Sequence, residues 1–282
     1  VAAAWVSSTE LHCIAPEHAG GVVSVEVTQN AQQYTVDGVS YEYEHVEAHS
    51  IHPNSGPTLG GTMVELRGSN IEAPDVRGLA CQFGSSEPVT ATHASREVVR
   101  CVAPASVSAG VVAVRLLNND AVYGSMVAFT YRTLAVVEQI EPVAGMLEGG
   151  TLVTLSGSGF VDTASSVCRF GDALVPARLI SASQLTCMSP RPSSSGYVAL
   201  EVTMNGQDFS TSGTLYEYQP SVAVYAVEPS RGPVDGGSFV NVTGVGFSRR
   251  AALLGYVWCR FNLTAVAAAW VSSTELHCIA PE

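Results

Sequence analysis

Apolar and polar residues alternate along short stretches of this chain. The segments 23–27, 112–116 and 198–202 read VSVEV, VAVRL and VALEV. A period of two residues is typical of a β-strand with one face in a core and the other in solvent. No stretch of the sequence shows a helical stripe of apolar residues at three- and four-residue spacing. The pattern therefore predicts an all-β fold.

A glycine-rich phrase precedes an alternating strand at three places. The phrase is Pro-x-x-Gly-x-x-x-Gly-Gly-(Thr/Ser), and it begins at Pro53, Pro142 and Pro229. Each following strand reads Val-x-(Leu/Val) and leads, two residues later, to another glycine: Gly68, Gly157 or Gly244. We expect the glycines to mark turns, or places where another backbone comes too close for a Cβ atom.

The same plan continues with ordered cysteines and aromatic residues, so the chain consists of repeated modules. Each complete plan contains Cys-x-Phe, then Cys-x-x-Pro, then a closing aromatic-x-Tyr. The first cysteines, at positions 81, 168 and 259, lie 87 (168 − 81) and 91 (259 − 168) residues apart. A larger repeat encloses the modules, because residues 1–17 recur letter for letter as residues 266–282, an offset of 265 positions. Such self-similarity indicates a tandem-repeat architecture.

This ordered set of motifs resembles the IPT/TIG domain, an immunoglobulin-like β-sandwich. The resemblance spans the whole chain and implies tandem β-sandwiches arranged end to end. Residues 46–132 and 133–219 resemble complete domains. Residues 220–282 resemble the N-terminal part of a domain that an equivalent of residues 18–45 in the next repeat would complete. Residues 1–45 resemble the C-terminal part of a domain that starts in the preceding repeat.

The shared 17-residue segment affects how these two part-domains would be completed. If residues 1–45 completed residues 220–282 of another chain, the two copies of the segment would compete for one place in the fold. The sequence therefore favours a continuous polypeptide over noncovalent complementation, with the shared segment at the seam between identical units.

The cysteines indicate the cellular compartment. Six of the seven form expected pairs within modules, separated by 20, 19 and 19 residues: Cys81–Cys101, Cys168–Cys187 and Cys259–Cys278. Cys13 is the repeat equivalent of Cys278, so its partner is expected in the preceding repeat. Repeated pairing at nearly constant spacing indicates a disulfide framework and an extracellular or cell-surface location. The alternative is seven buried thiols in a cytosolic protein.

Charge and sequons narrow the class of partner. Acidic residues outnumber basic ones by 25 to 13, and lysine is absent, which argues against nucleic acid as a partner. Charged residues make up only 13% of the chain, so glycans or contacts with neighbouring chains are expected to keep its surface soluble. Asn241 and Asn262 begin Asn-x-Thr sequons for N-linked glycans. Strand alternation points both side chains outward if Val242 and Phe261 point inward.

The search for chemistry predicts no enzyme, no cofactor and no metal site. The sequence lacks the nucleophile-elbow, Walker, His-Glu-x-x-His and EF-hand patterns. His45, His49 and His52 could join Glu44 and Glu47 around a metal, but alternation sends the first and last histidines to opposite faces, which favours solvated side chains.

The tryptophans and the hydropathy of the chain lead to two further predictions, one about core packing and one about membrane spans. Trp5, Trp258 and Trp270 could form a sugar-binding platform, although packing in the cores near the disulfides is favoured. No apolar run in this sequence is long enough for a transmembrane helix.

Three functional interpretations follow. The sequence favours a structural unit of 265 residues and three modules in a long secreted, disulfide-bonded glycoprotein that self-associates into an extracellular filament. Identical units present identical surfaces at a fixed spacing, which suits regular assembly. The alternative is the stalk or ligand-binding region of a large cell-surface receptor or adhesin. Accessory domains of a carbohydrate-active enzyme are a third, less favoured interpretation.

Overall fold

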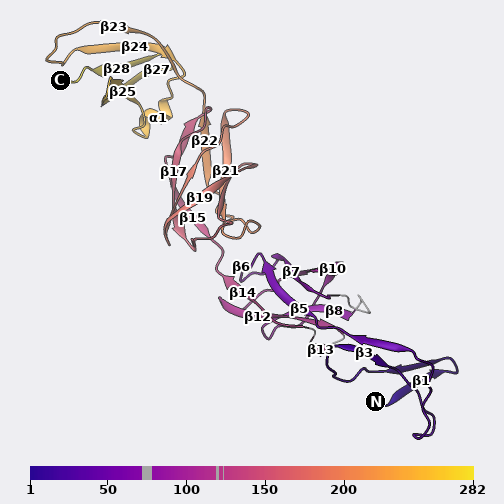
Figure 1. The fold of residues 1–282 in the computed structure, drawn as a ribbon. Coiled ribbons are helices and arrows are strands. Elements are labelled where there is room, and N and C mark those ends of the chain that lie inside the picture. The colour runs from indigo at the N-terminus through magenta and orange to yellow at the C-terminus, as the bar shows by residue number, and fades with distance from the viewer. Residues whose placement is uncertain (72–77, 119–120, 123) are drawn as a thin grey trace. The chain divides into compact units, whose positions relative to one another are not determined.

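The computed structural model describes residues 1–71, 78–118, 121–122 and 124–282, and β-strands dominate it (Figure 1). The chain divides into two compact units, Val1–Arg132 and Thr133–Glu282. The predicted all-β fold class is confirmed, since each unit contains β-sandwich modules in series. Among the residues described, no helix has the length and apolar character needed to cross a membrane.

Residues 1–45 form two antiparallel hairpins. In the first, β1 (Ala3–Ser7) pairs with β2 (Glu10–Cys13), and in the second β3 (Gly21–Ser24) pairs with β4 (Ser40–Tyr43). Most side chains of both hairpins are exposed to solvent.

Residues 46–132 form a two-sheet sandwich. Its strands are β5 (Glu47–His52), β6 (Ser55–Pro57), β7 (Met63–Ser69), β8 (Leu79–Phe83), β9 (Val89–Thr90), β10 (Thr92–Ser95), β11 (Val98–Val102), β12 (Gly110–Asn118), β13 (Ala121–Val122) and β14 (Val127–Arg132). One sheet has the order β10-β11-β7-β5 and the other β6-β14-β12-β8-β9, with β13 paired to β12. The short strand β6 runs parallel to β14, whereas the other pairs are antiparallel.

Residues 133–219 repeat this plan with one difference. The strands are β15 (Val136–Glu141), β16 (Ala144–Met146), β17 (Leu152–Ser158), β18 (Val167–Phe170), β19 (Ala173–Ser181), β20 (Gln184–Met188), β21 (Gly196–Thr203) and β22 (Leu215–Gln219). The long strand β19 pairs with β18 through its first half and with β20 through its second half. It thereby joins the two layers into one sheet of order β15-β17-β20-β19-β18-β21-β22-β16.

Residues 220–282 contain one four-stranded sheet and one hairpin. The elements are β23 (Ala223–Glu228), β24 (Phe239–Val245), α1 (Arg249–Leu253), β25 (Trp258–Phe261), β26 (Thr264–Ala267), β27 (Ala269–Ser272) and β28 (Glu275–Ile279). The sheet has the order β23-β24-β28-β27 (Figure 1). Outside this sheet, β25 pairs with β26. The short helix α1 begins after Ser248, whose Oγ accepts a hydrogen bond from the backbone N–H of Ala251 at 3.2 Å.

Alternating side chains from both layers form the cores of the two complete modules. In residues 46–132, Val64 and Leu66 of one sheet share a buried cluster with Phe83 and Phe129 of the other. The ring centroids of Phe83 and Phe129 lie 5.4 Å apart in an edge-to-face arrangement. Phe170 and Tyr216 repeat this contact in residues 133–219, at 5.2 Å. Burial of such rings is a major stabilising contribution in small sandwiches.

Candidate functional site

A disulfide bond joins the two layers of each of three modules. The bonds are Cys81–Cys101, Cys168–Cys187 and Cys259–Cys278, with Cα atoms 6.3, 6.4 and 6.3 Å apart. In every case the first cysteine lies on the strand that carries Cys-x-Phe and the second on a strand of the opposite layer. Cys13 is a free, exposed thiol in the described residues, on strand β2.

The two sequon asparagines occupy different surroundings. Asn262 is exposed in the turn between β25 and β26, where its φ is +53°. Asn241 lies on β24 between the buried residues Val240 and Val242. Its side chain is half-buried, and its Oδ1 is covered and has no hydrogen-bond partner within the described residues. Alternation places Asn241 on the outer face of its sheet, but that face is partly covered.

The histidine and tryptophan side chains lie in several different surroundings. His49 interacts with Glu47 at 3.8 Å and with Ser69 Oγ at 3.3 Å, and in the described part of the chain no group of His, Cys, Asp and Glu side chains has the geometry to hold a metal ion. Trp270 packs against the core of residues 220–282, as expected. The core position expected for Trp5 and Trp258 is wrong, because these side chains are 74% and 57% exposed. On β25, Cys259 takes the inward position, so alternation turns Trp258 outward.

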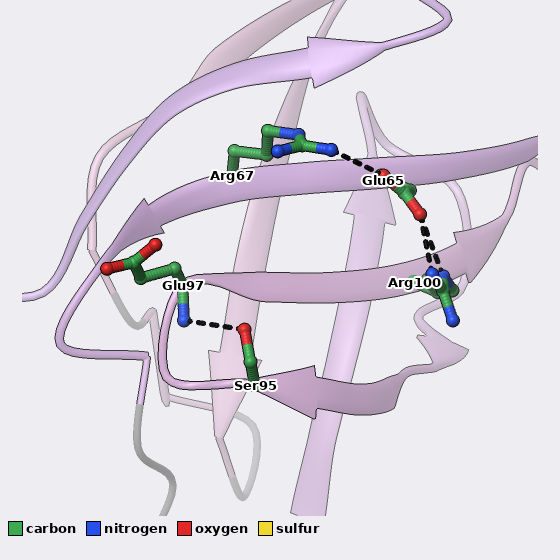
Figure 2. A network of polar contacts seen from close by, with 5 residues as sticks. All are labelled: Glu65, Arg67, Ser95, Glu97 and Arg100. Carbon is green, nitrogen blue, oxygen red and sulfur yellow. Dashed lines mark hydrogen bonds and ion pairs between the residues drawn. The ribbon is translucent and has the colours of Figure 1, made fainter.

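A polar network covers the outer face of one sheet (Figure 2). Glu65 of β7 accepts hydrogen bonds from Arg100 on β11, at 2.8 and 2.9 Å, and from Arg67 at 3.1 Å. The hydrogen bond from Arg100 lowers the pKa of the Glu65 carboxyl, and Arg67 adds to the effect. A carboxylate held ionised between two guanidinium groups is a poor proton acceptor, so the network serves to join neighbouring strands.

An apolar groove of about 790 Å³ lies in the unit Thr133–Glu282. Its walls come from β24, β25, β28, α1 and the segment 142–151, and include Val242, Phe247, Val257, Phe261 and Leu276. Grooves lined by aliphatic and aromatic side chains bind apolar groups of ligands or other chains. The lining of this groove is therefore suited to apolar groups.

Residues 249–256 build one end of the groove. They belong to a stretch, from Gly244 to Cys259, that is longer (259 − 244 = 15) than the matching stretch from Gly157 to Cys168 (168 − 157 = 11), and we call them the insertion. Tyr256 lines the groove and donates a hydrogen bond to Glu141 Oε1 at 2.8 Å, while its hydroxyl accepts one from the N–H of Val143 at 3.3 Å. Burial raises the pKa of Tyr256, and the bond to Glu141 raises it further. Arg250 Nε lies 3.3 Å from Glu217 Oε2. The sequence identifies the insertion but not these contacts, because each partner lies 33 or more positions away (250 − 217).

Comparisons with known proteins agree with this architecture. The model of the IPT/TIG domain matches residues 1–43, 47–131, 135–218 and 222–282. Mouse fibrocystin-L is 30% identical over 257 residues, which cover 86% of this chain and 6% of that protein. Mouse plexin-B2 is 30% identical over 206 residues, 70% of this chain and 11% of that protein. The chain thus spans a small part of these relatives.

A solved structure, the full extracellular region of plexin A4, shows a more distant likeness. The matched part covers 90% of this chain and 22% of the plexin A4 chain, with 17% sequence identity and a TM-score of 0.48. A likeness at this level carries no functional argument.

Proposed function

The chain belongs to the IPT/TIG domain family, and from this premise we propose that it is a segment of the extracellular region of a large cell-surface protein of the plexin or fibrocystin kind. The observation that carries the proposal is the succession of four family matches along one chain with relatives of that kind. In such a region the modules act as spacers and docking surfaces for other proteins.

Two features of the structure support an extracellular setting. A disulfide between the two layers recurs in three modules, and such bonds persist in oxidising compartments. The exposed sequon at Asn262 offers an acceptor for an N-linked glycan, which is also a property of secreted and surface proteins. Neither feature serves catalysis, and the proposal assigns none to this chain.

The filament favoured by the sequence has less support than the receptor-type region. The relatives reported above are named for plexins and fibrocystin-L, and neither name refers to a filament. Identity between residues 1–17 and 266–282 is compatible with both interpretations, because duplication of a unit lengthens a stalk as well as a fibre. The receptor-type region is therefore the primary proposal.

Antibody labelling of intact cells that make the native protein tests this proposal. An antibody raised against the 282-residue chain should label intact cells, and an antibody to a cytosolic protein should label them only after permeabilisation. If the antibody against the 282-residue chain also labels cells only after permeabilisation, a surface location is excluded. Continuous fibres detached from the cell surface would favour the filament instead.

A further inference from the structure

One outer face of each complete module carries an exposed pair of apolar residues. Met63 of β7 lies opposite Val102 of β11, and these side chains are 44% and 45% exposed. Leu152 of β17 lies opposite Met188 of β20, and these side chains are 58% and 52% exposed. Strand alternation assigns all four positions to the solvent side of the sandwich, where polar side chains are expected. An apolar pair on that side therefore needs a reason other than the core.

The pair occupies the same place in each module. It lies next to the strand pair that contains the second cysteine of the disulfide, which is Val64↔Cys101, Val153↔Cys187 or Val240↔Cys278. At this place residues 220–282 have Phe239 opposite Ile279. Single exposed apolar residues are common on protein surfaces and need no explanation. Recurrence of an apolar pair at one register position indicates a shared role of this face.

The next row of the same face in residues 133–219 has opposite charges at its two sides. The register places Glu141 beside Thr154, Thr154 beside Thr186, and Thr186 beside Arg178. Both charged side chains are exposed. Across the sheet, the row thus has an acid on β15, two hydroxyl side chains in the middle and a base on β19.

The same row in residues 46–132 has its charges in the same order. His52, Glu65, Arg100 and Thr92 follow one another across the strands β5, β7, β11 and β10. Glu65 and Arg100 lie side by side on this face (Figure 2). The acid therefore comes before the base in both complete modules when the equivalent strands are followed in the same direction.

A second copy of the chain is complementary to this pattern. A two-fold rotation about an axis that runs parallel to the strands, midway between two stacked faces, exchanges the two sides of the row and keeps the strand direction. Glu141 of each copy then faces Arg178 of the other, and Leu152 faces Met188. Stacked sheets lie ~10 Å apart, a distance that long side chains span from both sides. Facing groups of opposite charge favour this register over others.

The same rotation is favourable in the other complete module. It brings Glu65 of each copy to Arg100 of the other, and Met63 to Val102. Because the rotation keeps the strand direction, each module lies opposite the same module of the second copy. Both complete modules therefore support one kind of contact between parallel strands.

The net charge of the chain makes a neutral face the place where a second copy approaches at least cost. The chain carries a formal charge of −12, and two such chains repel each other. Residues 133–219 alone carry −5 (3 − 8), yet the central strands β17 and β20 of this face contain no charged residue. In the other complete module, Arg67 and Arg100 compensate the charge of Glu65.

We propose that two copies of this chain pair through the outer faces of the layers β10-β11-β7-β5 and β15-β17-β20-β19. The apolar pairs form the centre of each contact, and the charged rows fix its register. The contact is isologous, since the same surface serves on both copies, and it closes at two chains. This inference goes beyond the proposed function and does not depend on it.

The size of the contact explains why the pair recurs. A stable interface buries roughly 800 Å² on each partner, and one apolar pair with its charged row supplies only a part of that area. Contacts in successive modules act together because one chain links them. The affinity between two copies should therefore come from several weak contacts, one in each module.

Charged substitutions in one apolar pair test the proposal on the full 282-residue chain, with Cys13→Ser to prevent cross-linking through the free thiol. One variant carries Leu152→Glu and the other Met188→Arg, and each alone places a charge against an apolar side chain of the second copy. We expect each variant to dimerise about tenfold more weakly than the parent in sedimentation velocity. An equimolar mixture should regain dimerisation to within about threefold, because each mixed dimer has one contact between opposite charges and one original apolar contact.

Matched controls carry the same changes on the other layer of the module, at Leu174 and Leu215, which pair with β18 and β21 and are 59% and 55% exposed. Leu174→Glu and Leu215→Arg should dimerise like the parent chain, alone and mixed. A parent mass of one chain at all concentrations would overturn the proposal. Equal dimerisation by the test variants and the controls would overturn it as well, and so would a mixture of the test variants that stays as weak as each alone.

Discussion

At the scale of single residues, the two sequon asparagines have different surroundings, so we expect them to carry glycans to different extents. Asn262 projects from a turn into solvent, where the enzyme that attaches a glycan and the glycan itself meet no obstacle. Asn241 lies on the face of a sheet with Oδ1 covered, next to the strands that hold Glu228 and His277 opposite it. A bulky glycan there must displace its neighbours in the folded module.

We expect higher glycan occupancy at Asn262 than at Asn241 when the chain is secreted from eukaryotic cells. Glycopeptide mass spectrometry measures both sites in one sample. Asn262→Gln should remove most of the glycan mass, whereas Asn241→Gln should remove little. The reverse ranking would show that the covered side chain becomes accessible during folding.

Tyr218 makes the free energy of unfolding depend on pH in the alkaline range. Burial raises the pKa of its hydroxyl to about 12, and the nearby Tyr216 contributes to the rise. The folded state therefore holds this proton more tightly than the unfolded chain, whose tyrosines titrate near pH 10. The contribution to stability is complete below about pH 10, and it decreases as the pH rises from 10 to 12.

Denaturant unfolding between pH 9 and 12 measures this dependence. The free energy of unfolding should fall over that interval, and Tyr218→Phe should show a smaller fall. The variant should also lose about 1 kcal/mol at neutral pH, since its hydrogen bond to the carbonyl of Pro190 is absent. An unchanged pH dependence in Tyr218→Phe would assign the titration to another group.

At the scale of strands and turns, two kinds of glycine have different roles. A Cβ atom on Gly157 would lie 1.9 Å from the carbonyl oxygen of Val136 on the paired strand. Gly150 has a φ of +78°, but a Cβ atom there would meet nothing within 4 Å. The first glycine allows close approach of two backbones, and the second allows a left-handed turn.

Alanine substitutions should separate these roles. Gly157→Ala should destabilise the module by about 3 kcal/mol, because neither backbone can move without breaking pairs of the sheet. Gly150→Ala should cost about 1 kcal/mol of conformational strain. Thermal and denaturant unfolding of the two variants provide the comparison. Equal losses would mean that the strand Val136–Glu141 shifts freely to admit the methyl group.

Local sequence signals predict much of this fold, since alternation and spacing act over short distances. Val153 and Leu155 are buried as their alternation predicts, and Gly157 marks a close approach of backbones. The helix α1 could not be predicted, because its five residues are too few for a helical stripe. The groove could not be predicted either, since its walls come from segments that lie far apart in the sequence.

At the scale of the whole molecule, side chains of residues 249–256 connect the module 220–282 to the module 133–219 within the unit Thr133–Glu282. We call this connection the junction. Tyr256 contacts Glu141 and Val143, and Arg250 pairs with Glu217. Ser221 Oγ donates a hydrogen bond to Glu148, which lowers the pKa of that carboxyl. Such contacts resist relative motion of the segments that they join, beyond what a short linker supplies.

Tyr256→Phe should weaken this junction by about 1 kcal/mol, because it removes the hydrogen bonds to Glu141 and Val143 and keeps the ring. Hydrogen exchange measured by mass spectrometry should be faster in the segments 141–147 and 249–257. Tyr225→Phe is a suitable control, since the Tyr225 side chain is 71% exposed. Equal exchange in both variants would mean that the Tyr256 hydroxyl contributes nothing to the junction.

The disulfides between layers also limit how far a module can extend under mechanical force. Cys168 and Cys187 are separated by 19 residues, and the covalent bond keeps that loop closed when the chain is pulled from its ends. At ~3.4 Å per residue the loop withholds roughly 65 Å of contour length. Single-molecule pulling should therefore give shorter unfolding steps than the length of a module allows, and reduction should restore the missing length. A surface protein built from such modules therefore lengthens less under shear than one whose modules lack these disulfide bonds.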